Sequence, residues 1–191
     1  MKLPLLLLFP AALAFSQPFS AGIKAGLPLT DFLNTVNGVT STTTNRYVVG
    51  PMVELRLPFG LGVEFDVLYR HFDYTNVVGS GVNALTSTGH AGDWEFPLVA
   101  KYKFKAPIVR PYVEAGVSWD TLSGVTNAVG ITNQNGTVMG AVLGGGIDIH
   151  ALVLHISPEL RYTRWTSQHF NVSGVLNSNQ SQAEFLVGIT F

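Results

Sequence analysis

The 191-residue chain contains no cysteine and few charged residues, and beyond its first residues it lacks any long apolar run. Zero cysteines exclude a disulfide-stapled scaffold and thiol chemistry. Charged residues make up 12% of the chain, and 11 Lys and Arg stand against 12 Asp and Glu, so no basic face for nucleic acid is indicated. After Phe15 no stretch approaches the ~18 apolar residues that a membrane helix needs, which excludes a helical membrane protein.

The N-terminus has the pattern of an export signal. A short basic start is followed by an apolar run that is too short to span a bilayer as a helix, and small residues follow it. We predict that residues 1–16 are a signal peptide cleaved after Ser16, which leaves Gln17 at the start of a single domain over residues 17–191. Ala14 offers a second cleavage position, and no cysteine is available for lipid attachment.

Eight segments of alternating apolar and polar residues follow, each long enough to cross a bilayer as a tilted strand. In lipid every backbone polar group must be paired within the protein, so such a chain can span only as a closed sheet. We therefore predict an all-β fold, an eight-stranded antiparallel up-and-down transmembrane β-barrel. The expected strands are 20–29, 46–58, 61–74, 93–104, 110–121, 137–149, 152–165 and 182–191.

The connections between these segments are alternately long and short. Long loops outside and short turns inside are typical of outer-membrane barrels, and an even strand count puts both termini on the periplasmic, short-turn side. The loops expected to face outward are 31–45, 75–92, 122–136 and 166–181.

The third segment shows the alternation most clearly. Leu61, Val63 and Phe65 share one face, while Glu64 and Asp66 share the other. The pattern alone leaves open whether the apolar face meets lipid or a soluble core. The export signal, the even count, the loop lengths and the aromatic positions favour lipid, and hence the bacterial outer membrane.

By this parity, fifteen charged side chains point into the barrel. An interior of eight strands is just wide enough for side chains to fill, so we expect paired charges that plug the lumen. Glycines on the sixth segment, Gly140, Gly144 and Gly146, are expected to make room for Arg and Lys side chains opposite. The predicted lumen charge network comprises Lys24, Glu54, Arg56, Glu64, Asp66, Arg70, Glu95, Lys101, Lys103, Arg110, Glu114, Asp148, Glu159, Arg161 and Glu184.

Aromatic residues gather at the ends of the segments. An amphipathic ring prefers the headgroup level of a bilayer, so these residues predict an aromatic belt, although core packing would also explain them. The belt residues are Trp94, Trp119 and Trp165 at the long-loop ends, and Phe59, Phe104 and Phe191 at the short-turn ends.

Enzyme and metal signals are weak. His155, Ser157 and Glu159 supply the residue types of a hydrolase triad and resemble the His-x-Ser element of outer-membrane lipid A deacylases. Parity places them on the lumen face, whereas a lipid-cleaving site must reach the bilayer, so no catalysis is expected. The histidines, among them His71 and His150, fall at scattered positions without ligand spacing, and no metal or other cofactor is predicted.

Several segments carry a family resemblance. Residues 62–70 (GVEFDVLYR), 94–98 (WEFPL), 110–116 (RPYVEAG), 144–148 (GGGID) and 158–162 (PELRY) resemble outer-membrane beta-barrel domain proteins, broadly the small OmpA-like and OmpX-like porin-family barrels. The resemblance implies an eight-stranded barrel inserted by the barrel-assembly machinery, and Phe191 resembles the C-terminal aromatic that this machinery reads. It implies no activity.

Two function classes remain. As a structural or surface-interaction protein, the chain would contact outer-membrane lipid, lipopolysaccharide or surface ligands through its loops, with residues 40–44 and 76–88 in contact. The alternative is a narrow gated pore for ions or small solutes, opened by rearranging lumen pairs. The protein is expected to act as a monomer.

Overall fold

The computed structural model describes residues 18–30, 33–35, 39–78, 85–123, 137–151, 153–167, 171–172, 176–178 and 180–191. The predicted signal peptide, residues 1–16, and the cleavage position between Ser16 and Gln17 lie outside these ranges. Among the described residues, no helix has the length and apolar character to span a membrane.

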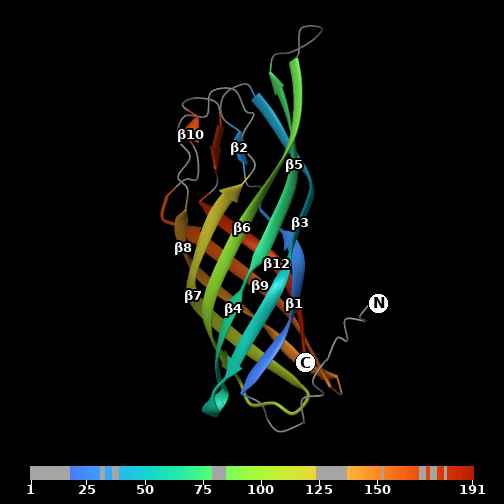
Figure 1. Cartoon of the computed structure of the whole chain (residues 1–191), viewed down its shortest axis with the longest axis vertical. Helices are drawn as coiled ribbons and strands as arrows, with labels where there is room; N and C mark the ends of the chain where they lie inside the picture. The colour runs from blue at the N-terminus through green and yellow to red at the C-terminus, as the bar shows by residue number, and fades with distance from the viewer. Residues whose placement is uncertain are drawn as a thin grey trace, which may run out of the picture.

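Eight antiparallel walls close into a barrel, which confirms the predicted fold class (Figure 1). Each wall is one strand, except that the consecutive strands β4 and β5 share one. The sheet closes because β1 pairs with both β12 and β3. Around the barrel the walls follow the order β1, β12, β9, β8, β7, β6, β4 with β5, and β3. Their bounds are β1 Phe19–Pro28, β3 Val39–Arg56, β4 Leu61–Asp66, β5 Leu68–Val78, β6 Leu85–Lys103, β7 Val109–Ser123, β8 Val138–Ala151, β9 Leu154–Trp165 and β12 Ser181–Thr190.

Strands β4 and β5 form a single wall. Both pair with β3, and the register is the same on either side of the break, with Met52 opposite Asp66 and Val49 opposite Tyr69. It shifts only further along, between Thr44 and Tyr47. The break falls at Val67, whose amide donates to the carbonyl of Pro51 over 3.0 Å. Because proline has no N–H, the return hydrogen bond of this pair is missing.

The barrel is polar inside and apolar outside. Most charged side chains of the walls are buried, while large apolar side chains on the alternate positions are exposed, so the apolar face is the outer surface and not a core. Among the described residues few apolar side chains are buried, and one small cluster contains Val48, Leu68 and Leu186. Examples from the exposed outer band are Ile23, Leu27, Leu55, Leu98, Val113, Leu143, Leu160 and Phe185.

The long-loop end contains more strand than the sequence predicts. The segments 31–45 and 75–92, expected as loops, belong in part to β3, β5 and β6, which pair as far as Val78 opposite Leu85. Three short strands form a separate sheet, β2 (Leu33–Thr35), β10 (Asn171–Val172) and β11 (Leu176–Ser178). Because β11 pairs with β2, the first and last of the expected loops are joined (Figure 1). Sequences rich in Thr and Ser predict loops in these segments, but backbone pairing between neighbouring strands continues through them.

The opposite end is closed by short turns. The 3₁₀ turn η1 (Pro58–Gly60) joins β3 to β4, and its residues Phe59 and Gly60 have φ of 67° and 83°. A Cβ at Gly60 would collide with the carbonyl oxygen of Lys103, so the neighbouring wall approaches this turn closely. Strand β1 begins and β12 ends at this same end.

Candidate functional site

A cluster of seven buried charges, here called the central cluster, fills the barrel interior. Its residues are at most 3% exposed. The members come from five strands and comprise Lys24, Glu64, Asp66, Lys101, Glu114, Glu159 and Arg161. A desolvated charge is costly unless it is paired, and each member here has at least one ion-pair partner.

One ion pair of this cluster joins opposite walls. Arg161 on β9 and Asp66 on β4 lie four walls apart in either direction around the barrel, yet Nη1 of Arg161 is 2.9 Å from Oδ2 of Asp66. The guanidinium also binds Glu114 through Nε at 3.0 Å. The cross-section at this level is therefore filled by side chains that meet across the lumen.

Two lysines complete the central cluster. Nζ of Lys24 lies 2.6 Å from Glu64 and 3.0 Å from Glu159, and Nζ of Lys101 lies 2.7 Å from the other oxygen of Glu64. The hydroxyl of Tyr112 donates to Glu159 over 2.7 Å, and Lys101 sits 4.5 Å from the centre of the Tyr112 ring. Carboxylate oxygens are thus shared among several donors, which fixes their positions.

A second group, here called the Arg70 cluster, lies nearer the long-loop end. Nη2 of Arg70 is 2.6 Å from Glu95 and 2.6 Å from Glu184, and Nη1 is 3.1 Å from Asp93 and 3.9 Å from Asp120. Sequence reasoning missed Asp93 and Asp120, although each directly neighbours a tryptophan assigned outward, Trp94 and Trp119, and parity alone indicates that both aspartates point inward.

At the short-turn end the interior opens into a cavity of about 700 Å³, here called the turn-side pocket. Nζ of Lys103 bridges Glu54 at 2.6 Å and Asp148 at 3.1 Å. Within the described part of the chain, Nε and Nη2 of Arg56 have no hydrogen-bond partner. The lining residues are Glu54, Arg56, Leu57, Gly60, Leu61, Lys103, Phe104, Lys105, Ala106, Pro107, Arg110, Asp148, His150 and His155.

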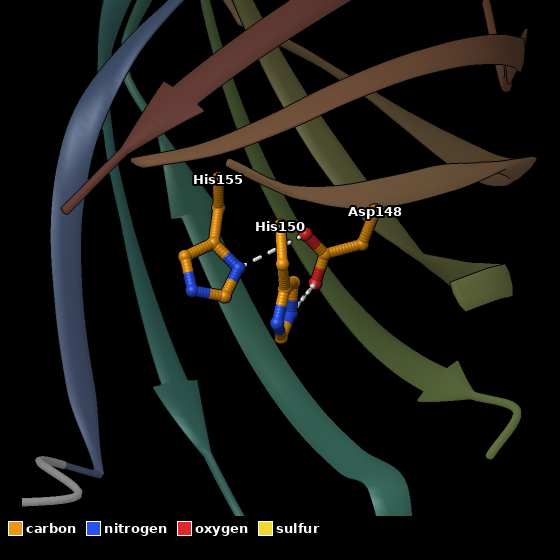
Figure 2. A group of neighbouring side chains, drawn as sticks. All are labelled: Asp148, His150 and His155. Carbon is orange, nitrogen blue, oxygen red and sulfur yellow. Dashed lines mark hydrogen bonds and ion pairs between the residues drawn. The ribbon is translucent and has the colours of Figure 1, made fainter. Parts of the chain in front are cut away.

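Two histidines and an aspartate meet in this pocket (Figure 2). His150 on β8 lies opposite His155 on β9, and their ring centres are 4.0 Å apart. Nδ1 of His155 is 3.0 Å from Oδ1 of Asp148, and Nε2 of His150 is 3.7 Å from Oδ2. The sequence shows no ligand spacing along the chain, but Asp148 and His150 are two residues apart on one strand face and the tight β8–β9 hairpin brings His155 alongside.

The structure distributes the fifteen predicted lumen residues over these three places. Ten of them belong to the central and Arg70 clusters, and three more, Glu54, Lys103 and Asp148, form the ion pairs of the pocket. Within the central cluster, Glu114 and Lys101 also contact each other at 3.4 Å. Arg56 and Arg110 line the pocket, and Nε of Arg110 donates to the carbonyl of Ala106 over 3.0 Å.

The aromatic belt is wrong for Trp165. This ring is 1% exposed and packs against Gly140, whereas Trp94 is 41% exposed. Position 165 has the same parity as Arg161 and therefore points inward, a signal that its place at a strand end obscured. Trp119 is half-buried, and Phe59, Phe104 and Phe191 are exposed.

The inward glycines accommodate different partners from those predicted. A Cβ at Gly144 would lie 2.6 Å from Oε1 of Glu114, and one at Gly146 would lie 2.8 Å from the Tyr112 hydroxyl. The space is therefore taken by a carboxylate and aromatic rings, not by Arg and Lys, because the cations reach the lumen centre from other walls.

The three triad-like residues do not act together. Glu159 is held by Lys24, Lys101, Arg161 and Tyr112. His155 faces Asp148, and within the described residues no hydrogen bond joins it to Ser157. The arrangement provides no activated serine for nucleophilic attack.

A sequence model of the outer membrane protein beta-barrel domain family matches residues 2–191, and the chain belongs to this family. Membership places it in the bacterial outer membrane. The outer membrane protein OprG from Pseudomonas aeruginosa shares the fold with 14% identity and a TM-score of 0.60 over 90% of this chain and 92% of that one. Neisserial surface protein A (NspA) shares it with 12% identity and a TM-score of 0.53 over 91% and 96%. No curated protein matches the chain in sequence.

Proposed function

We propose that this chain is a structural barrel of the outer membrane whose lumen is closed to solutes, and that it acts through the surface built by its loop-side strands. The observation that carries this proposal is the ion pair between Arg161 and Asp66, which joins opposite walls within a buried cross-section. Opening a path would require separating several such buried pairs at once, which is costly in a low-dielectric interior.

The loop-side strands extend far beyond the aromatic level. The rings of Tyr69 and Trp94 contact each other at 5.1 Å between centroids, and Trp94 is exposed to the outside. Strand β5 continues for nine further residues to Val78, paired with β6 throughout. At about 3.3 Å per residue this is roughly 30 Å of paired strand. The extension supports a projecting surface that contacts polar partners, and lipopolysaccharide is the partner that we propose.

The proposed orientation follows from the connections. Outer-membrane barrels place long loops outside the cell and short turns in the periplasm, so η1 and the turn-side pocket would face the periplasm. A signal peptide over residues 1–16, cleaved after Ser16, would supply the export that this orientation needs.

Single-channel recordings in planar bilayers test the closed lumen. We expect no steady conductance from the unmodified protein, because the central cluster fills the cross-section. The narrow gated pore is the competing function, and the turn-side pocket favours it because it gives solutes an entry from one side. Steady events whose ion selectivity changes in Arg161→Gln would establish the pore and overturn the closed lumen.

Binding to immobilised lipopolysaccharide tests the surface role. Because Asp73 pairs with His90, replacing residues 74–89 with Asn-Gly should close a shorter hairpin in the same register. We expect this variant to lose most of the binding while keeping the heat-modifiable gel migration of a folded barrel. Lys105→Glu, an exposed change at the opposite end, is the matched control and should bind as the unmodified protein does. Equal binding of lipopolysaccharide by the shortened variant would contradict the proposed binding surface.

A further inference from the structure

We propose that Asp148, His150 and His155 form a binding site for a borderline transition-metal ion, Zn²⁺ in the first instance, at the turn-side mouth of the barrel. One ligand atom from each residue lies within 4.8 Å of those of the other two. Two imidazoles and one carboxylate are a donor set typical of zinc and related ions. The site lies at the opposite end from the loop-side surface, so it stands or falls independently of the proposed function.

The spacing of the donors suits metal coordination. Bonds of about 2.0–2.1 Å in a tetrahedral shell separate neighbouring ligands by roughly 3.3 Å. Nδ1 of His155 and Oδ1 of Asp148 are 3.0 Å apart, and Nε2 of His150 and Oδ2 are 3.7 Å apart. Because one donor atom from each residue lies within 4.8 Å of the other two, side-chain rotations can bring all three to this spacing. Figure 2 shows the two rings on the same side of the carboxylate, each facing a different oxygen.

The backbone holds the three donors in place. Asp148 and His150 lie on one face of β8, and the hairpin to β9 sets His155 directly opposite His150. Sites on paired strands are more precisely positioned than sites on loops. Nε2 of His150 is buried and has no hydrogen-bond partner within the described residues, so with the ring proton on Nδ1 this nitrogen is free to bind metal.

The remaining donors need only modest rearrangement. A neutral imidazole carries one proton, and placing it on Nε2 of His155 frees Nδ1 to bind metal. Lys103 competes for Oδ2 of Asp148 at 3.1 Å, but it also has Glu54 at 2.6 Å. Lys103 can therefore keep Glu54 as its partner while Asp148 turns to the metal.

The charge of the pocket determines which ions can bind. Of the described residues, Arg56, Lys103, Lys105 and Arg110 line it against two carboxylates, Glu54 and Asp148. Hard cations such as Mg²⁺ and Ca²⁺ bind through several oxygen ligands and bring positive charge without compensation. Zn²⁺, Cu²⁺ and Ni²⁺ gain strong bonds from neutral imidazoles, so the site should select them. Three protein ligands leave a further coordination position open to the cavity.

Calorimetric titration of the detergent-solubilised, chelator-stripped protein with Zn²⁺ alone tests the site. We expect one Zn²⁺ per chain, undiminished by excess Mg²⁺, and a loss of at least ~10-fold in affinity in His150→Gln and in His155→Gln. His71→Gln is the matched control, because Nε2 of His71 also faces a carboxylate, that of Asp73 at 3.3 Å. Both residues lie on β5, and neither belongs to the proposed site on β8 and β9. Lys103→Met should tighten binding, while Lys105→Met should change it much less.

The same titrations can overturn the proposal. It fails if the unmodified protein binds Zn²⁺ no better than His150→Gln/His155→Gln, or if His71→Gln weakens binding as much as the site variants. A second measurement needs no variant. In the unmodified protein, Zn²⁺ should protect His150 and His155, but not His71, from acylation by diethyl pyrocarbonate, and equal modification of all three would also reject the site.

Discussion

Arg70 on β5 and Glu184 on β12 stand on walls separated by β3 and β1, yet Nη2 of Arg70 lies 2.6 Å from Oε1 of Glu184. The same guanidinium contacts Asp93 and Glu95, so one cation faces several carboxylates inside the barrel. Arg70 therefore has several acidic partners, so the cation and any one of these partners contribute differently to the network. Removing the cation and removing one anion should have different consequences.

Arg70→Met should destabilise the barrel strongly. The substitution leaves Asp93, Glu95, Asp120 and Glu184 buried together without their cation, and breaking a buried ion pair in this way costs about 3–5 kcal/mol. Urea unfolding in lipid vesicles, followed by the heat-modifiable shift on gels, measures the change. Lys105→Met, at an exposed position of the turn, should stay within about 0.5 kcal/mol and serves as the control. Similar changes in the free energy of unfolding for Arg70→Met and Lys105→Met would contradict the buried network.

Glu184→Gln should be tolerated far better than Arg70→Met. Neutralising one of four carboxylates around a single guanidinium reduces their mutual repulsion and keeps the amide able to accept a hydrogen bond. We expect the free energy of unfolding to change by less than about 1 kcal/mol. The same urea titration measures it, and the double variant completes a cycle in which a coupling of about 0.5–3 kcal/mol is expected. A loss as large as that of Arg70→Met would show that the anions, not the cation, limit this cluster.

The eight walls and the inward charges could be predicted because period-two alternation is local. Glu64 and Asp66 reveal their face from neighbouring residues alone, since side chains of a strand point alternately to opposite sides. Which charges meet could not be predicted in this way. The pairing of Arg161 with Asp66 depends on barrel closure and on the positions of walls that are distant in the sequence.

The turn-side pocket shows a different reason for a missed site. Along its own strand His155 resembles part of a triad, whereas in the barrel its neighbours His150 and Asp148 come from the adjacent strand. A hairpin places residues equidistant from its turn side by side, so reading across β8 and β9 would have revealed the cluster. The strand-end position of Trp165 predicts a belt residue, but the parity that it shares with Arg161 turns its ring into the barrel.

Gly144→Ala should destabilise the barrel more than Gly145→Ala. A Cβ at position 144 would lie 2.6 Å from Oε1 and 2.9 Å from Cγ of Glu114, which is held by Arg161. At position 145 the nearest atom is a backbone oxygen at 3.1 Å. Overpacking of this kind costs about 1–3 kcal/mol, so Gly144→Ala should unfold at lower urea. Equal midpoints for the two adjacent alanine variants would mean that Glu114 moves away freely and that the cluster is loosely packed.

Tryptophan fluorescence should separate Trp94 from Trp165, which the sequence placed in one belt. Trp94 is 41% exposed on the outer surface, and Trp165 is 1% exposed inside the barrel. In vesicles that contain brominated lipid, the variant Trp119→Phe/Trp165→Phe keeps only Trp94 and should be quenched, because its indole reaches the headgroup level. The variant Trp94→Phe/Trp119→Phe keeps only Trp165 and should be quenched far less, because the barrel wall separates the ring from lipid. Vesicles of the same lipid without bromine provide the control for each variant. Quenching of Trp165 as strong as that of Trp94 would place its ring on the lipid face and reverse the inward parity of β9, and with it the inward assignment of Glu159 and Arg161.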